Sequence, residues 1–150
     1  MDASQSEVQP LPRVLAIANQ KGGVGKTTTT INLATALAAV RKRVLVVDLD
    51  PQGNASTGLG LHNVDRRVNC YHVLIGEADV PNTCRKTDVP GLDAIPSGTD
   101  LAGAEIELVD VEDRLYRLKA SMAGNVARYD YVLIDCPPAL GLLTVNALIA

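Results

Sequence analysis

The sequence predicts an α/β fold in which a mostly parallel, doubly wound sheet carries helices on both faces. Three observations support this prediction. Nearly unbroken apolar runs lie within residues 14–18, 44–47 and 129–135, as expected for buried parallel strands. Stretches with helical spacing of apolar residues separate these runs. Each run also leads into a glycine-rich or carboxylate-containing turn, the usual place for ligand-binding groups in such sheets.

The composition indicates one ordinary globular domain. The chain has 150 residues, 47% of them apolar, so it can bury a core. A net charge of −3, without any run of five or six basic residues, means that DNA binding cannot be inferred from composition. The three cysteines lack metal-type spacing and favour a reduced, cytoplasmic protein. No apolar stretch reaches the ~18 residues needed to span a bilayer, and the N-terminus lacks a signal pattern.

The chain begins with a segment that we predict to be a disordered tail. Residues 1–12 are polar, contain two prolines and show no periodicity. The predicted domain therefore covers residues 13–150. Its first element is the strand at 14–18, which leads directly into a glycine-rich loop.

Residues 19–28 read Asn-Gln-Lys-Gly-Gly-Val-Gly-Lys-Thr-Thr, the pattern of a phosphate-binding P-loop. Glycines let successive backbone N–H groups approach phosphate oxygens, and the helix that follows adds its N-terminal partial charge. Lys26 would reach the outer phosphates, while the Thr27 hydroxyl would coordinate magnesium. The alternative is a glycine-rich surface turn with two solvated lysines. The candidate nucleotide-binding residues are Lys21, Gly22, Gly23, Val24, Gly25, Lys26, Thr27 and Thr28.

Helical spacing predicts a helix from Thr27 to about Arg41, although four consecutive threonines are poor helix formers. A requirement for hydroxyl groups at the phosphates explains Thr27 and Thr28. It leaves Thr29 and Thr30 as residues that the helix tolerates.

The strand at 44–47 leads into residues 48–53, which read Asp-Leu-Asp-Pro-Gln-Gly. Strand alternation would place Asp48 and Asp50 on the same face, at the edge of the sheet where ligands bind. Aspartates also occur before Pro and Gly simply as turn residues. The P-loop upstream favours a role in ligand binding.

The middle of the chain contains weaker signals, from which we predict elements in order. Turn residues predict an exposed loop over 53–68, and a short helix follows at 70–76. Short strands are expected within 80–87 and 92–96. The cluster at 97–100 offers an N-cap for a helix over 101–108, and a further helix is expected over 112–122.

The third apolar run ends at Asp135 and is followed by Cys-Pro-Pro. An aspartate after a buried strand, downstream of a P-loop, is the Walker B arrangement, in which the carboxylate holds magnesium directly or through a water molecule. Cys136 has no evident base beside it, so we interpret it as a packed residue. Residues 142–150 are apolar and helix-like.

These motifs resemble those of the ParA/MinD family of ATPases with a deviant Walker A motif, and most closely its chromosomal ParA/Soj-type partition branch. The matching stretches are residues 18–28, 47–55, 100–105 and 135–138. The resemblance implies ATP and Mg²⁺ as cofactors and gives Lys21, Lys26 and Asp50 catalytic roles. Lys21 would reach the nucleotide of the partner in a dimer, Lys26 would bind phosphate in its own chain, and Asp50 would orient or activate water. Thr27, Asp48, Asp50 and Asp135 would support the metal site.

The resemblance also implies partners and a location. Family members form ATP-dependent homodimers, bind DNA non-specifically and are stimulated by a ParB-type centromere-binding protein, on chromosomes or plasmids. They are cytoplasmic, associate with the nucleoid and need no membrane. Family domains continue beyond position 150 and carry their DNA-binding residues there, so we expect an N-terminal portion whose fold lacks its C-terminal part.

Two alternatives remain open at this point. The chain could be a truncated nucleotide-binding or dimerisation module without turnover, or a MinD-like membrane-surface ATPase whose amphipathic tail would lie beyond residue 150. A nitrogenase-iron-protein-like chain would need cluster cysteines, and Cys70, Cys84 and Cys136 are poorly placed for that role.

Overall fold

A computed structural model of the protein describes residues 10–21 and 25–150. Residues 1–9 of the predicted tail, and Gly22, Gly23 and Val24 of the predicted loop, lie outside the described residues. Residues 10–12 have no regular secondary structure. The elements, in chain order, are β1 (Arg13–Ile17), α1 (Lys26–Ala39), β2 (Val44–Asp48), α2 (Asn54–Gly58), η1 (Asn63–Arg66), α3 (Cys70–Ile75), α4 (Val80–Thr83), β3 (Arg85–Lys86), β4 (Leu92–Ile95), η2 (Thr99–Gly103), α5 (Ala104–Glu107), η3 (Arg114–Tyr116), α6 (Arg117–Met122), β5 (Tyr131–Asp135) and α7 (Leu142–Ile149).

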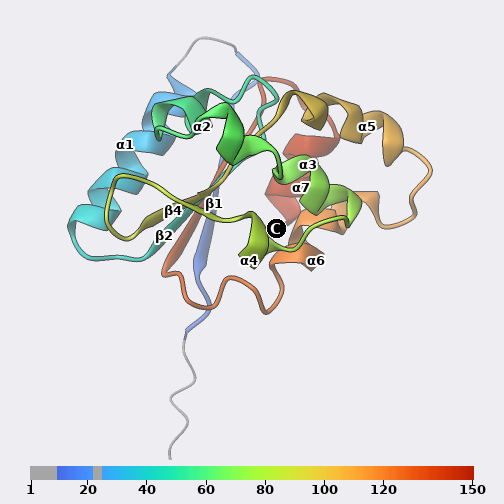
Figure 1. Cartoon of the computed structure of the whole chain (residues 1–150). Coiled ribbons are helices and arrows are strands. Elements are labelled where there is room, and N and C mark those ends of the chain that lie inside the picture. The colour runs from blue at the N-terminus through green and yellow to red at the C-terminus, as the bar shows by residue number, and fades with distance from the viewer. Residues whose placement is uncertain (1–9, 22–24) are drawn as a thin grey trace, which may run out of the picture.

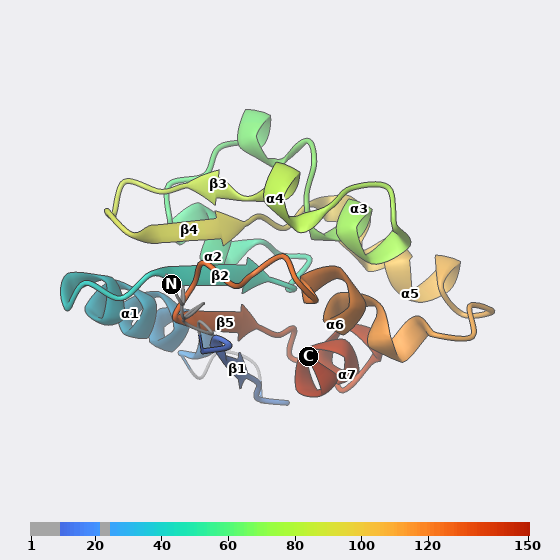
Figure 2. The ribbon, with the colours of Figure 1, turned by 90° about the horizontal axis from the view of Figure 1, so that it is seen from below.

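The five-stranded sheet lies between α1 and α3 in Figure 1, and it has the order β1-β5-β2-β4-β3, which can be followed in Figure 2. The pairs β1–β5, β5–β2 and β2–β4 are parallel, and only β3 is antiparallel to its neighbour β4. Every residue of β2 is buried, because this strand has neighbours on both edges and helices on both faces. The predicted α/β fold with a mostly parallel sheet is confirmed.

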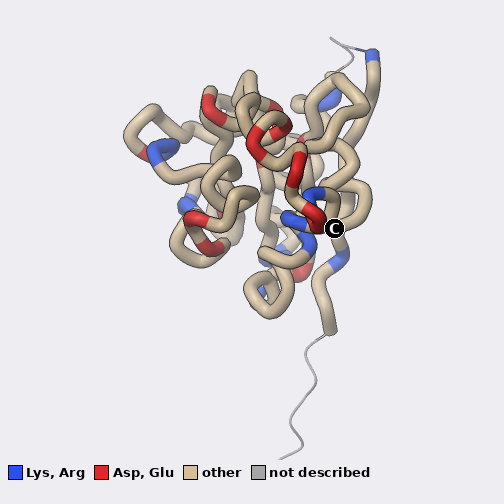
Figure 3. Tube along the Cα trace, turned by 90° about the vertical axis from the view of Figure 1, so that its right-hand side faces the viewer, with Lys and Arg blue, Asp and Glu red and all other residues tan. Residues whose placement is uncertain are grey.

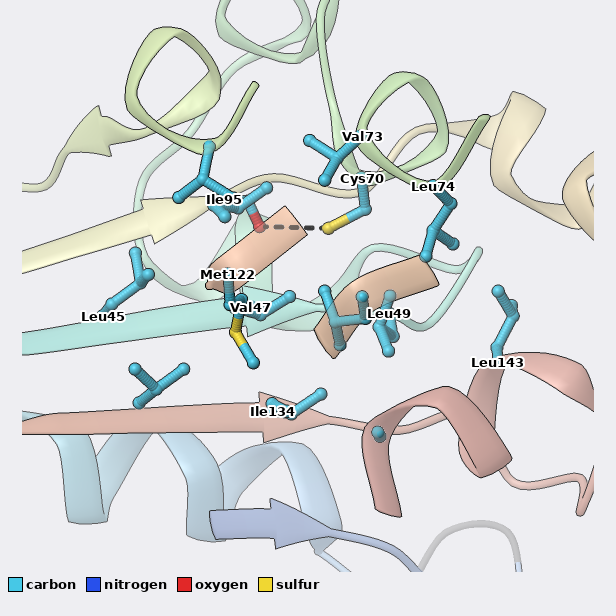
Figure 4. Packing of buried hydrophobic residues seen from close by; sticks show 14 of the residues in the cluster. Leu45, Val47, Leu49, Cys70, Val73, Leu74, Ile95, Met122, Ile134 and Leu143 are labelled. Atoms are coloured by element: carbon cyan, nitrogen blue, oxygen red, sulfur yellow. Dashed lines mark hydrogen bonds between the residues drawn. The ribbon is translucent and has the colours of Figure 1, made fainter. Parts of the chain in front are cut away.

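Helices cover both faces of the sheet, so the fold is doubly wound. Helix α1 packs on one face with Val44, Val46 and Leu133. Helices α3, α5, α6 and α7 pack on the other face with Leu45 and Val47, as Figure 2 shows from below and Figure 4 shows in detail. Successive residues of β2 thus supply opposite layers, which explains why its sequence is apolar at every position.

One prediction for the middle of the chain was wrong, and another is confirmed over only part of its range. Residues 53–68 are not a plain loop but contain α2 and the 3-10 turn η1. Residues 80–83 form helix α4 instead of a strand, because the Asp79 side chain accepts a hydrogen bond from the backbone N of Asn82 at 2.8 Å and Pro81 fits the first helical turn. The short strand predicted within 80–87 is confirmed as the two residues of β3.

The two predicted helices before β5 are shorter than expected. Over 101–108 the chain starts with the 3-10 turn η2 and then forms α5, and over 112–122 the 3-10 turn η3 precedes α6. Within residues 10–21 and 25–150, every helix is too short or too polar to cross a membrane.

Candidate functional site

The carboxyl ends of β1, β2 and β5 meet at one edge of the sheet. In the parallel register, Asp135 at the end of β5 lies opposite Ile17 on β1 and Asp48 on β2. Beyond the strand ends, the backbone N of Leu49 donates to the Asp135 carbonyl at 2.9 Å, and the backbone N of Cys136 donates to the Ile17 carbonyl at 3.1 Å. The topology therefore brings together three segments that are far apart in the sequence.

Lys26 and Asp135 form a buried ion pair at the start of α1. The Lys26 Nζ lies 2.8 Å from Asp135 Oδ1, and the side chains are 10% and 0% exposed. The Thr27 Oγ1 donates to Asp135 Oδ2 at 2.9 Å. Gly25 precedes the helix in the left-handed region, with a φ of 76°, which glycine adopts without strain. The carboxylate is stabilised by a positive charge and by hydroxyl donors, as a buried charge requires.

Thr30 is a site residue that sequence reasoning missed. Its Oγ1 lies 3.3 Å from Asp135 Oδ1 and 3.0 Å from the Lys26 carbonyl oxygen, and the residue is fully buried. We interpreted Thr30 as merely tolerated in the helix, but its hydroxyl is used. Its spacing in the sequence could have identified it as a site residue, because a residue one turn after Lys26 and Thr27 lies on the same helix face. Thr28 and Thr29 are exposed, and the role of Thr28 stays a prediction.

Lys21 precedes the glycine-rich loop in the sequence, whereas Lys26 follows it, and Lys21 is exposed. Its backbone N donates to the Asn19 side-chain oxygen at 2.9 Å. The structure does not pair Lys21 with the buried carboxylates, so its action across a dimer stays a prediction, as do the roles of Gly22, Gly23 and Val24, which are not among the described residues.

Asp50 faces Lys26 from the turn after β2. Its Oδ2 lies 3.9 Å from Lys26 Nζ, while its Oδ1 accepts a hydrogen bond from the backbone N of Gln52 at 3.0 Å. Asp50 is only 6% exposed. Asp50 and Asp135 therefore flank the same lysine, and Oδ2 of Asp50 is the oxygen directed toward it.

The carboxylate of Asp48 is directed at the backbone of Asp50 and at Ser56, and not at Lys26. Its Oδ1 accepts from the backbone N of Asp50 at 3.1 Å, and its Oδ2 accepts from the backbone N and the Oγ of Ser56 at 2.8 and 2.7 Å. Burial raises the pKa of Asp48 to about 6, although the hydrogen bonds from Ser56 and Asp50 oppose this shift. Because β2 ends at Asp48, strand alternation does not continue to Asp50, and Asp48 acts on Asp50 through the backbone.

Two serines extend this buried polar network, and no motif in the sequence pointed to them. The Ser56 Oγ accepts from the backbone N of Ser97 at 2.9 Å, and the Ser97 Oγ donates to the Asp50 carbonyl at 2.6 Å. Both serines are buried. The network links the ends of β2 and β4 and fixes the backbone on both sides of Asp50.

The oxygen donors at this edge fit a magnesium ion. Mg²⁺ is usually held by one or two carboxylates together with phosphates and waters, and not by a cage of protein side chains. Thr27 Oγ1 and Asp135 Oδ2 are adjacent hard oxygen donors of this kind. Among residues 10–21 and 25–150, no group of three or more His, Cys, Asp or Glu side chains could form a metal cage.

Comparison with known proteins agrees with this geometry. The family model for an AAA domain (AAA_31) matches residues 12–150. The chromosome partitioning protein ParA of Caulobacter vibrioides is 60% identical over 140 residues, which cover 92% of this chain and 52% of ParA. The sporulation initiation inhibitor protein Soj of Bacillus subtilis is 54% identical, over 92% of this chain and 54% of Soj.

A solved structure extends the comparison. The cobyrinic acid a,c-diamide synthase of Mycobacterium smegmatis, with a bound ATP analogue and magnesium, matches with a TM-score of 0.88 and 45% identity, covering 92% of this chain and 56% of the synthase. The chain spans about half the length of the curated relatives it matches. The chain therefore belongs to the AAA domain family, and its resemblance to the ParA/Soj-type partition ATPases, predicted from its motifs, is confirmed.

Proposed function

We propose that this chain binds ATP with Mg²⁺ and hydrolyses it as part of a ParA-type partition protein. The observation that carries the proposal is the buried contact of Lys26 and Thr27 with Asp135 at the start of α1. This arrangement places a phosphate-binding lysine, a hydroxyl and a carboxylate together where a helix N-terminus attracts anions. The bound ATP analogue and magnesium of the M. smegmatis synthase support the choice of ligand.

The residues have distinct proposed roles. Lys26 binds the outer phosphates, aided by backbone N–H groups of residues 22–25 and by Thr28. Thr27 and Asp135 hold magnesium, which when bound neutralises charge on the phosphates. Asp50 orients the attacking water. Its Oδ2 faces the Lys26 ammonium group, so the carboxylate lies beside the proposed position of the outer phosphates. Asp48 supports the metal site indirectly by fixing the Asp50 backbone.

Lys21 acts on a second copy of the chain in this proposal. It is exposed at the edge that carries Lys26 and Asp135, so it is available to a partner's nucleotide. A cation supplied in trans can raise the rate of phosphoryl transfer by about 10³–10⁵. Hydrolysis would then require an ATP-dependent homodimer.

The wider cellular role rests on the similarity to ParA and Soj. We propose a cytoplasmic, nucleoid-associated protein that segregates a chromosome or plasmid with a ParB-type centromere-binding protein. Non-specific DNA would be bound through residues outside this chain, and no membrane would be involved.

A second candidate function is a nucleotide-binding module without turnover. It is favoured by one observation, namely that the chain spans about half the length of its relatives. The two candidate functions differ only in whether bound ATP is hydrolysed, so measurements of binding and turnover on one sample distinguish them.

Binding of a fluorescent ATP analogue, with and without magnesium, tests the proposal. The wild-type chain should bind in a magnesium-dependent manner, and Lys26→Ala should weaken binding at least tenfold. Lys119→Ala is the matched control, since this exposed lysine on α6 lies outside the site. Absence of binding by a folded wild-type chain would overturn the proposal for this chain.

Phosphate release from the same samples distinguishes the two candidates. Turnover that is lost in Lys21→Ala, while binding persists, would support hydrolysis by a dimer. Binding without turnover in the wild type would favour the second candidate.

A further inference from the structure

The amino edge of the sheet, opposite the candidate nucleotide site, collects positive charge. Main-chain hydrogen bonds connect the segments that precede the strands: Arg13 N donates to the Asp130 carbonyl, and Asp130 N donates to the Arg43 carbonyl. Val44 N donates to the Gly91 carbonyl, which adds the turn before β4. The cations at this edge are Arg13, Arg41, Lys42, Arg43, Lys86 and Arg128.

These six cations are out of proportion to the composition. The whole chain has 14 Lys and Arg against 17 Asp and Glu, whereas among residues 10–21 and 25–150 the same edge carries three acidic residues, Asp88, Asp93 and Asp130. In Figure 3, several Lys and Arg positions lie in the lower half of the molecule, together with a few Asp and Glu positions. The edge is therefore locally positive on a chain whose net charge is −3.

Three of these cations line a hollow of about 370 Å³. Arg43, Lys86 and Arg128 line it, together with the turn between β3 and β4, Asp93 and Tyr129. The volume falls in the range of small-molecule sites, about 300–1,000 Å³. The hollow thus brings together three cations from three separate segments of the chain.

Two of the three cations are held in place. Arg128 donates to the Tyr129 hydroxyl at 2.6 Å and lies 4.8 Å from the ring centroid, and Tyr129 in turn donates to Asp93 at 2.7 Å. Arg43 pairs with Asp130 at 3.2 Å. Each guanidinium group keeps further N–H donors for a ligand, and its fixed orientation suits the oxygens of a phosphate.

Lys86 completes the set. It is exposed and forms no ion pair within residues 10–21 and 25–150. Because Asp93 and Asp130 offset part of the arginine charge, a ligand must carry more than one negative charge to bind here in competition with salt.

We propose that this hollow is a second anion site, which binds a small ligand carrying two or more phosphate groups. It lies at the opposite ends of the same parallel strands from Lys26 and Asp135, about 16 Å away along a five-residue strand. The two sites therefore use different residues and can be occupied independently.

Calorimetric titration with inorganic tripolyphosphate at low ionic strength tests the site in the Lys26→Ala background, where the P-loop is weakened. Binding should persist in that background. Lys86→Gln/Arg128→Gln should weaken it at least tenfold, whereas the matched pair Arg114→Gln/Lys119→Gln, which removes one Arg and one Lys elsewhere on the surface, should change it less than twofold. Persistence of binding in Lys26→Ala also separates this site from the proposed nucleotide site.

Two outcomes would overturn the proposal. One is absence of tripolyphosphate binding by a Lys26→Ala chain that circular dichroism shows to be folded (the same titrations in the wild-type background decide if it is not), or an equal loss in both double variants. The other is Lys86-dependent binding of a short DNA duplex without binding of tripolyphosphate, which would make the edge a nucleic-acid contact. If Arg128→Gln prevents folding, as circular dichroism would show, Lys86→Gln alone decides, because the Lys86 side chain has no hydrogen bond within the described residues.

Discussion

The two edges of the central sheet hold their charged groups in different environments. At the carboxyl edge, Lys26 and Asp135 are 10% and 0% exposed, and they contact each other, threonine hydroxyls and, through Lys26, Asp50. At the amino edge, the Arg43 and Asp130 side chains are 53% and 35% exposed. The same kind of ion pair should therefore be strongly coupled to folding at one edge and weakly coupled at the other.

The largest expected effect comes from removing the buried cation. Lys26→Met keeps most of the side-chain volume but leaves Asp135 without its charge partner. Loss of one member of a buried pair costs about 3–5 kcal/mol, so the free energy of unfolding should fall by this amount. Urea denaturation measures it, with Arg43→Met as the control at the other edge. Similar losses in the two variants would contradict the contrast between the edges.

An effect of intermediate size is expected for Asp48 as the pH changes. Its pKa is about 6 in the folded chain and 3.8 ordinarily, so its favourable contribution is present below about pH 4 and is lost as the pH rises to about 6. The loss is on the order of 2–3 kcal/mol. Urea denaturation of wild type and Asp48→Asn across this range should show a difference that changes by this amount. A constant difference would show that Asp48 ionises normally.

The smallest effect, with the opposite sign, is expected for Asp130. Arg43 lowers the pKa of Asp130, so the pair contributes stability above the ordinary value of 3.8 and loses it as the pH falls through the folded pKa. Asp130→Asn should lower the urea midpoint slightly near pH 7 but not at strongly acidic pH. Because the pair is exposed, about 0.5 M salt should reduce the difference. A salt-independent loss would mean that the pair is not a surface interaction.

The carboxyl edge was largely predictable because its signals are local. The glycine-rich loop, the buried strands and Asp135 each occupy a short stretch of sequence, and parallel strands bring their ends to one edge. Local signals were less exact within 80–87, where a capping aspartate and a proline favour a helix over 80–83 and confine the predicted short strand to Arg85–Lys86.

Other parts of both edges could not be predicted because they depend on contacts between distant segments. The hydrogen bond between Ser97 and Ser56 joins residues 41 positions apart; Ser56 lies in no recognisable motif, and Ser97 belongs only to a helix N-cap cluster that does not point to this site. The amino-edge hollow likewise draws Arg43, Lys86 and Arg128 from three segments. A search for runs of basic residues cannot detect such a cluster, since the strand order creates it.

The serine network has a consequence for the motions of the candidate site. The amides of Ser56 and Ser97 are buried donors to side-chain oxygens, although both lie outside the strands. Their exchange with deuterated solvent should therefore require opening of the sheet and proceed as slowly as that of the strand amides. The turn that carries Asp50 should therefore open as rarely as the strands of the sheet.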